Sequence, residues 1–174
     1  MFGSYPLYSV DASAFIDFGK LRPEVFPAMW ELVGRLSQQG RLLMCEEAAD
    51  ECRDAELRRF IRAHPGMVVI FEDTGDYLTR LQAEAPGYGI QQIDPSSTRS
   101  NADPFVVALA LMLEQRDLRD LRAKLNPEAQ CLVVTHERPK GPGATYVKIP
   151  NACRFYGLEC IDWQDFLMRE GYRG

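Results

Sequence analysis

Short apolar runs that alternate with helical stretches are the feature that most constrains the fold of this chain. Four of these runs have the length and composition of buried strands, namely residues 7–11, 42–44, 67–71 and 131–135. Strands that alternate with helices predict a parallel sheet covered by helices on both faces. We therefore expect an α/β fold, a three-layer α/β/α sandwich around a central, mainly parallel sheet of four to five strands.

The segments between these runs show the spacing of apolar residues that is typical of helices. Helices are predicted over residues 13–18, 23–39, 46–63, 74–85, 103–115, 117–125 and 163–170. The helix 103–115 is apolar on nearly all sides, which predicts that it is buried. Two more short strands are candidates at 146–149 and 158–161, and residues 86–101 have the composition of a long loop.

The size and composition of the chain fit one domain over residues 1–174. Hydrophobic residues make up 46% of the chain, which is enough for a substantial core. The net charge of −5 argues against a protein that coats nucleic acid through a basic surface. It does not exclude a nuclease, because a cluster of acidic metal ligands itself lowers the net charge. No apolar run approaches the roughly 20 residues that span a membrane, so we expect no membrane contact.

The cysteines and the N-terminal residues indicate a cytoplasmic protein. The five cysteines, Cys45, Cys52, Cys131, Cys153 and Cys160, are odd in number and form no Cys-x-x-Cys pair. This usage is typical of a reducing compartment. Residues 1–6 do not have the basic start and apolar stretch of a signal peptide.

Four dispersed acids suggest the chemistry. Asp11 ends the first strand pattern, Glu137 follows the fourth, Asp103 opens the apolar helix, and Glu51 lies in the helical stretch after the second strand. Ligand sites of α/β proteins form beyond the carboxyl ends of parallel strands. Carboxylates gathered there would bind a hard cation, Mg²⁺ or Mn²⁺. A metal-dependent phosphodiesterase or nuclease is therefore the leading interpretation.

Each acid also has a structural explanation. Asp11 and Asp103 could cap helices, and Glu51 and Glu137 could be ordinary surface charges. Capping does not exclude ligation, because a carboxylate has two oxygens. A hydroxyl accompanies an acid at two strand ends, since Ser13 follows Asp11 by two residues and Thr135 precedes Glu137 by two. This recurrence favours a common site.

The chain resembles the PIN-domain (PilT N-terminus-like) nucleases, and most closely a stand-alone, poorly characterised PIN-like branch. The resemblance rests on Val10–Ser13, Ala102–Ala108 and Val133–Glu137, which are similar to the first, third and fourth motifs of the family. The segments 147–153 and 157–162 resemble the branch. The second motif is an acid on the helix after the second strand, most similar to Glu51, with Glu47 as a rival on the same helix face and Asp50 as a weaker one.

The resemblance implies a metal-dependent endoribonuclease in which water on Mg²⁺ or Mn²⁺ hydrolyses an RNA phosphodiester. The implied catalytic and metal-binding residues are Asp11, Glu51, Asp103 and Glu137, although the family usually has Asp at the last position. Ser13 and Thr135 would orient carboxylates by hydrogen bonds, and Arg138 and Lys140 would contact substrate phosphates. The family includes toxins of toxin–antitoxin pairs, so a cognate antitoxin and a homodimer are further implied partners.

Two other readings stay open. One is a PIN-like interaction module with weak catalysis that acts through a protein partner; it need not bind Mn²⁺, and Asp11→Asn should leave its partner binding intact. The other is a different phosphoryl-transfer enzyme on a similar sheet. Against it, the chain has no Gly-x-x-x-x-Gly-Lys-Ser/Thr loop, and no Gly-x-Gly-x-x-Gly follows any strand pattern.

Overall fold

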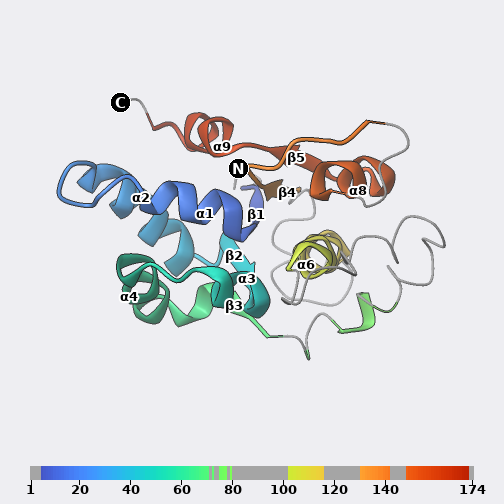
Figure 1. The fold of residues 1–174 in the computed structure, drawn as a ribbon, viewed down its shortest axis with the longest axis horizontal. Helices are drawn as coiled ribbons and strands as arrows, with labels where there is room; N and C mark the ends of the chain where they lie inside the picture. The colour runs from blue at the N-terminus through green and yellow to red at the C-terminus, as the bar shows by residue number, and fades with distance from the viewer. Residues whose placement is uncertain are drawn as a thin grey trace.

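The computed structural model describes residues 5–70, 72, 75–77, 79, 102–115, 130–141 and 148–172. Its centre is a sheet of five parallel strands in the order β3-β2-β1-β4-β5 (Figure 1). The strands are β1 (Leu7–Val10), β2 (Leu42–Cys45), β3 (Val68–Val69), β4 (Cys131–Val134) and β5 (Glu159–Ile161). The predicted α/β class with a central parallel sheet is therefore confirmed.

The strand order places a topological switch point between β1 and β4. From β1 the chain runs outward to β2 and β3, and it later returns to the other side of β1 to form β4 and β5. β1 and β4 are paired in register, with Val10 opposite Val134. The crevice outside the carboxyl ends of two such strands is where doubly wound α/β folds bind ligands. Asp11 and Thr135 directly follow these two strands.

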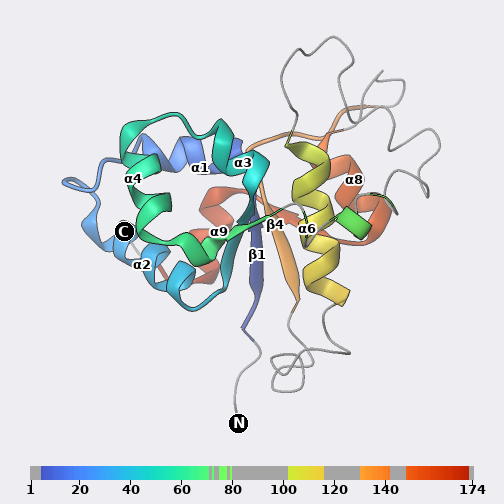
Figure 2. The same ribbon diagram turned by 90° about the horizontal axis from the view of Figure 1, so that it is seen from below.

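Helices α6 (Asp103–Gln115) and α8 (Ile149–Tyr156) cover one face of the sheet (Figure 2). α6 is buried along the central strands, as its apolar sequence predicts, and Val106 to Ala110 are almost fully inaccessible. The buried Ser9 hydroxyl of β1 donates a hydrogen bond of 2.9 Å to the carbonyl oxygen of Val106. This bond satisfies a polar group in the core and fixes α6 against β1.

The opposite face is covered by α1 (Ala12–Gly19), α2 (Pro27–Gln38) and α9 (Trp163–Arg169). Aromatic side chains join these helices to each other and to the sheet. The Phe18 ring lies 4.3 Å from that of Trp30 and 4.9 Å from that of Trp163, centroid to centroid. The Tyr8 ring of β1 meets Phe166 edge-on at 4.7 Å. Helices on both faces complete the three-layer sandwich.

The predicted helix over residues 46–63 is two helices, α3 (Glu46–Glu51) and α4 (Ala55–Ala63). The break follows from local capping. The Asp54 carboxylate accepts hydrogen bonds from the backbone N–H groups of Glu56, at 2.9 Å, and Leu57, at 3.4 Å. Asp54 therefore starts a new helix in a different direction. α4 packs closely on α1, since a Cβ atom on Gly19 would lie 2.7 Å from Leu57 Cγ.

The candidate strand 146–149 is wrong where the structure describes it. Lys148 has extended backbone at the N-cap position of α8, and Ile149 is the first helical residue. Pro150 near the helix start favours this geometry, because its fixed φ suits the first turn of a helix. Gly157, with φ of 72°, ends the helix in the left-handed conformation.

Other boundaries differ by a few residues. The helix predicted from residue 23 begins at Pro27, and the strand predicted from residue 67 is the two-residue β3 after the 3-10 helix η1 (Pro65–Met67). The predicted loop 86–101 and the predicted helix 117–125 lie outside the described residues. Most of the predicted helix 74–85 does too, but Asp76 and Tyr77 are described and are helical. Among the described helices, none is long and apolar enough to cross a membrane.

Candidate functional site

Asp11 lies at the switch point, and the neighbouring strand fixes its backbone. The Asp11 N–H donates a hydrogen bond of 2.9 Å to the carbonyl oxygen of Val134, directly after the last paired residues of β1 and β4. Asp11 occupies the N-cap position of α1, but it makes no side-chain capping hydrogen bond of ordinary geometry. The backbone at Ser13 still lowers the pKa of the carboxylate, so the start of α1 also stabilises its ionised form.

Two hydroxyl groups hold the Asp11 carboxylate. Ser13 Oγ donates a short hydrogen bond to Asp11 Oδ2, and Thr135 Oγ1 donates a second one of 2.8 Å to the same oxygen. Each hydroxyl oxygen also accepts a backbone N–H, from His136 at 3.2 Å for Ser13 and from Glu137 at 3.1 Å for Thr135. The amides leave each hydroxyl hydrogen directed at the carboxylate. The hydrogen bonds expected of Ser13 and Thr135 are thus present, and they tie the end of β1 to the end of β4.

Burial shifts the pKa of the Asp11 carboxylate. The residue is 4% exposed, and this burial raises its pKa above the ordinary value. The hydroxyl hydrogen bonds lower the pKa and the charge of Glu137 raises it. Within the described part of the chain, no lysine, arginine or histidine forms an ion pair with Asp11. A buried carboxylate in the field of another acid is a favourable place for a cation.

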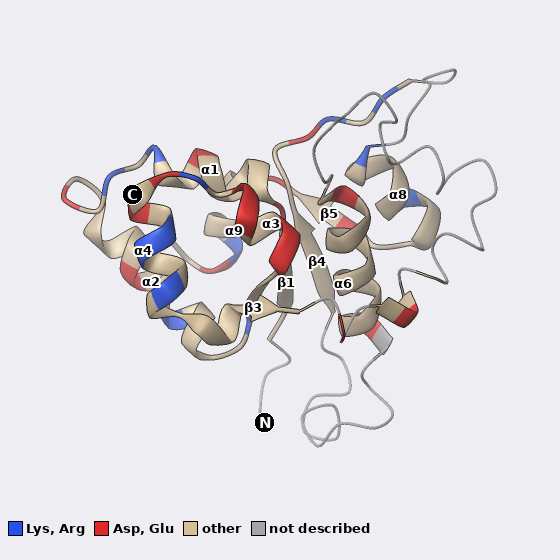
Figure 3. Ribbon diagram, turned by 60° about the horizontal axis from the view of Figure 1, so that its bottom comes forward, with Lys and Arg blue, Asp and Glu red and all other residues tan. Residues whose placement is uncertain are grey.

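Glu51 joins the end of α3 to the start of α6. Its Oε1 accepts a hydrogen bond of 3.2 Å from the backbone N–H of Ala102, the residue before Asp103. Glu51 is exposed by surface area, yet partial desolvation of its carboxylate raises its pKa and the Ala102 N–H lowers it. The charge of Asp11 raises the pKa, Arg53 lowers it, and Glu137 raises it again. Asp103 is half-buried at the first residue of α6. The structure thus brings Glu51 next to the start of α6 and within the field of Asp11 and Glu137, and the acidic positions of α3 lie by the end of β1 (Figure 3).

Glu47, the rival of Glu51, has different surroundings. Burial is the main cause that raises its pKa, followed by the charges of Glu46 and Asp50 on its own helix. Its Oε2 atom is buried and has no hydrogen-bond partner among the described residues. Glu51 is therefore the acid that interacts with the other candidates, while Glu47 keeps an unpaired buried oxygen one turn away.

Glu137 is already engaged in contacts that the sequence did not predict. Its carboxylate forms an ion pair with Lys148 and accepts a hydrogen bond of 3.0 Å from the backbone N–H of Ile149 at the start of α8. The side chain is only 14% exposed. Glu137 therefore anchors α8 as well as contributing charge to the site. The Lys-Ile-Pro sequence that begins this helix is the signal that could have predicted the contact.

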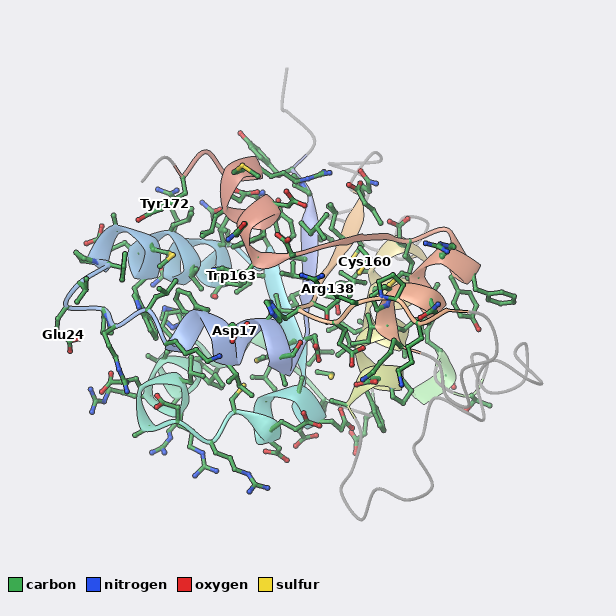
Figure 4. All side chains as sticks on the ribbon, turned by 45° about the horizontal axis from the view of Figure 1, so that its top comes forward. Asp17, Glu24, Arg138, Cys160, Trp163 and Tyr172 are labelled. Carbon is green, nitrogen blue, oxygen red and sulfur yellow. The ribbon has the colours of Figure 1, made fainter. Side chains whose placement is uncertain are left out.

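The two candidate phosphate contacts follow Glu137 directly. Arg138 is exposed, and Figure 4 shows it between Asp17 of α1 and Cys160 of β5. The backbone of Lys140 is fastened to α8 by Asn151, whose Oδ1 accepts the Lys140 N–H at 2.9 Å and whose Nδ2 donates to the Lys140 carbonyl at 3.0 Å. This segment is thereby held beside the acids, which would suit contacts to a bound polyanion.

A hollow of about 440 Å³ lies against the same strand ends. Thr135 and Glu137 line it from the end of β4, and Pro150, Cys153 and Arg154 line it from α8. Cys160 and Ile161 of β5 complete this side. Of the four candidate acids, Glu137 lines the hollow, and Thr135 links the hollow to the Asp11 carboxylate.

The donor set fits a hard divalent cation in its chemistry. All the candidate ligands are carboxylates, which Mg²⁺ and Mn²⁺ prefer, and the buried Oε2 of Glu47 has no hydrogen-bond partner among the described residues. Burial disfavours the ionised form of Asp11, and a bound cation would offset that cost. Over the ranges that the structure describes, no three histidine, cysteine or acidic side chains converge closely enough to hold a metal ion. Asp11, Glu51 and Asp103 are the residues that would hold it, together with Glu137, which is already paired with Lys148.

Comparison with known proteins gives a family without an assigned activity. A family model described as a domain of unknown function (DUF4411) matches residues 8–117 and 123–173. No curated protein matches the chain, and no solved structure matches it. The match covers nearly all of the sequence, including the four acids. The chain belongs to the DUF4411 family.

Proposed function

We propose that this protein is a Mg²⁺- or Mn²⁺-dependent endoribonuclease with a PIN-like site. The observation that carries the proposal is the Asp11 carboxylate, which is buried at the switch point, held by two hydroxyls and placed in the field of another acid. Such a group is costly to keep ionised unless a cation binds it. The position corresponds to the ligand-binding crevice of α/β folds.

The proposed roles follow from the contacts of each residue. Ser13 and Thr135 fix the Asp11 carboxylate through Oδ2, and Asp11 would be a ligand of the cation. Glu51 and Asp103 approach from α3 and from the start of α6, with Ala102 between them as a fixed backbone donor. A bound cation supplies an activated water and neutralises charge on the phosphate. Arg138 and Lys140 are proposed to position the RNA backbone.

Glu137 is proposed as the fourth acid. It also has a structural role, because it is paired with Lys148 at the start of α8. By accepting the Ile149 N–H it holds the start of α8, and with it the wall of the hollow, against the end of β4. Single-stranded RNA is the proposed substrate. A cognate inhibitory protein of the antitoxin type is the proposed partner, a homodimer the proposed assembly, and the cytoplasm the proposed compartment.

The test is cleavage of labelled single-stranded RNA by the purified full chain with Mn²⁺, with Mg²⁺ and with EDTA. We expect cleavage only with the metals, and we expect the double variant Asp11→Asn, Asp103→Asn to fall to the EDTA background. Glu46→Gln, an exposed acid on α3, is the matched control and should cleave like the wild type. Full activity in EDTA, or unchanged activity of the double variant, would sink the proposal.

Two further variants separate the candidate second acids. Glu51→Gln should weaken Mn²⁺ binding, measured by calorimetry, more than Glu47→Gln does, because Glu51 lies in the field of Asp11 and Glu137. The reverse order would assign the second position to Glu47. A chain that binds no Mn²⁺ but still captures a protein partner after Asp11→Asn would instead support the interaction module.

A further inference from the structure

Two of the five cysteines lie near each other at the wall of the hollow. Cys153 lies on α8 and Cys160 on β5, and the turn at Gly157 brings the two elements together. Each thiol is the largest influence on the pKa of the other, which places the two side chains near each other. Both cysteines are free, and both line the hollow beside Glu137. The pair is therefore close together without being crosslinked.

Accessibility distinguishes Cys160 from the other four cysteines. Cys160 is only partly buried, and it faces a hollow wide enough for small molecules (Figure 4 labels its position). Cys45, Cys52 and Cys131 are each 0% exposed, and so is Cys153, although it lines the hollow. A small oxidant in solution can thus reach Cys160 through the hollow but has no comparable route to Cys45, Cys52 or Cys131.

The pKa values of the thiols also favour Cys160 as the reactive cysteine. The Cys153 thiol lowers the pKa of Cys160, against the opposing effects of burial and of the charges of Asp11 and Glu137. Burial raises the pKa of Cys52 to about 12, and it also raises the pKa values of Cys45 and Cys131. The thiolate is the reactive form of cysteine, so Cys160 is the expected nucleophile of the five.

We propose that Cys153 and Cys160 form a redox-reactive pair that a hydroperoxide converts to a disulfide. In the first step the Cys160 thiolate attacks the terminal oxygen of the hydroperoxide and the O–O bond breaks. The leaving oxygen takes a proton from solvent and departs as an alcohol or as water. Cys160 is then a sulfenic acid. In the second step Cys153 attacks the Cys160 sulfur, the S–O bond breaks, water leaves, and the S–S bond forms. The pair loses two electrons, and the hydroperoxide is reduced by two.

The disulfide would have a defined structural effect. It would crosslink α8 to β5, while Glu137 already holds the start of α8 through the Ile149 N–H. The start and the middle of α8 would then both be fixed to the edge of the sheet beside Glu137. The inference needs neither RNA nor a metal ion, so it stands or fails independently of the proposed ribonuclease activity.

The experiment treats the folded full chain with hydrogen peroxide in EDTA, without RNA, and maps all five cysteines by mass spectrometry. We expect a Cys153–Cys160 disulfide as the first product, formed at least about 10-fold faster than oxidation at Cys45, Cys52 or Cys131, because only Cys160 combines access with a lowered pKa. Cys153→Ser should stop the reaction at a Cys160 sulfenic acid, which dimedone traps. Cys160→Ser should abolish both products, and Cys52→Ala is the control that should change neither.

A second measurement uses only the wild type, so it does not depend on whether the cysteine variants fold. A short pulse of iodoacetamide on the untreated wild type should alkylate Cys160 before the three buried cysteines. Equal oxidation or alkylation of all five cysteines would overturn the proposal. So would a disulfide between two chains in place of the Cys153–Cys160 bond, or a Cys153→Ser variant in which dimedone traps nothing at Cys160.

Discussion

Replacing Thr135 by valine tests whether the hydroxyl network exists to hold an ionised Asp11. Valine keeps the shape of the side chain but removes the donor to Asp11 Oδ2 at 2.8 Å and the acceptor of the Glu137 N–H at 3.1 Å. Thr135 is 2% exposed, so water does not readily replace either partner. Ser13 keeps its own hydrogen bond to the carboxylate.

The expected cost can be built from these two contacts. A hydrogen bond to a charged group contributes about 1.5–3 kcal/mol and a neutral one about 0.5–1.5 kcal/mol, so Thr135→Val should lower the free energy of unfolding by about 2–4 kcal/mol. Thr135→Ser keeps the hydroxyl and loses only a methyl group, which costs about 1 kcal/mol. In Mn²⁺ titrations, loss of a group that orients a ligand should weaken binding about 10–100-fold for valine.

The pH dependence has a definite sign. The folded Asp11 has a pKa above its ordinary value of 3.8, so ionisation of Asp11 destabilises the fold as pH rises through the folded pKa. The Thr135 hydrogen bond lowers that pKa, and its removal raises the pKa further. The part of the valine effect that comes from Asp11 is therefore absent below the ordinary pKa and complete above the folded one.

Urea unfolding of the metal-free wild type and both variants, near pH 4 and near pH 7.5, measures these differences. We expect the gap between wild type and Thr135→Val to widen toward the higher pH, and Thr135→Ser to follow the wild type. An equal gap at both pH values would refute the argument that Thr135 supports an ionised carboxylate. A serine variant as unstable as the valine variant would show that packing, not the hydroxyl, is what matters.

Three other outcomes follow from the same structure. Asp11→Asn should raise the metal-free unfolding free energy near pH 7, since it removes a buried charge whose folded pKa is raised, and Mn²⁺ should raise the melting temperature of the wild type alone. Gly19→Ala should destabilise by about 1–3 kcal/mol in urea unfolding, because its Cβ would lie 2.7 Å from Leu57, whereas Gly66→Ala meets nothing within 4 Å and should be near neutral. Glu170→Gln should cost about 3–5 kcal/mol, since it leaves the Arg41 guanidinium, 14% exposed, without its charged partner.

Local pattern predicted those parts of the fold that local forces determine. The apolar run that ends at Val10 and the run that ends at Val134 are strands because their residues are buried on both faces of a parallel sheet. The break at Asp54 was also predictable, since Asp is a strong N-cap, but the continuous charge pattern over 46–63 concealed it. The strand predicted around Ile149 was wrong because the apolar residues there fit a strand. Pro150 instead favours the first turn of a helix, which begins at Ile149.

Some contacts of the candidate site could likewise be predicted from the sequence, and others could not. Asp11, Ser13 and Thr135 could be predicted together, because strand ends that are paired in register bring their next residues side by side. The contact of Glu51 with the Ala102 N–H could not, since it depends on how α3 packs against α6 across a separation of 51 residues. Sequence spacing carries no information about such packing.

The ion pair of Glu137 shows why a list of acids does not define a metal site. The sequence predicts Glu137 as the fourth ligand, although with Glu where the family usually has Asp, whereas in the fold its carboxylate is paired with Lys148 and its second oxygen holds the start of α8. Asp11 has the opposite environment, with hydroxyl donors and no described cation. Because a carboxylate with a cationic partner gains less from binding a metal than one without, affinity should depend on Asp11 far more than on Glu137. Lys148→Met should therefore increase Mn²⁺ affinity, as measured by calorimetry, while Asp11→Asn abolishes it, and a loss of affinity in Lys148→Met would show that the lysine supports the metal site instead of competing with it.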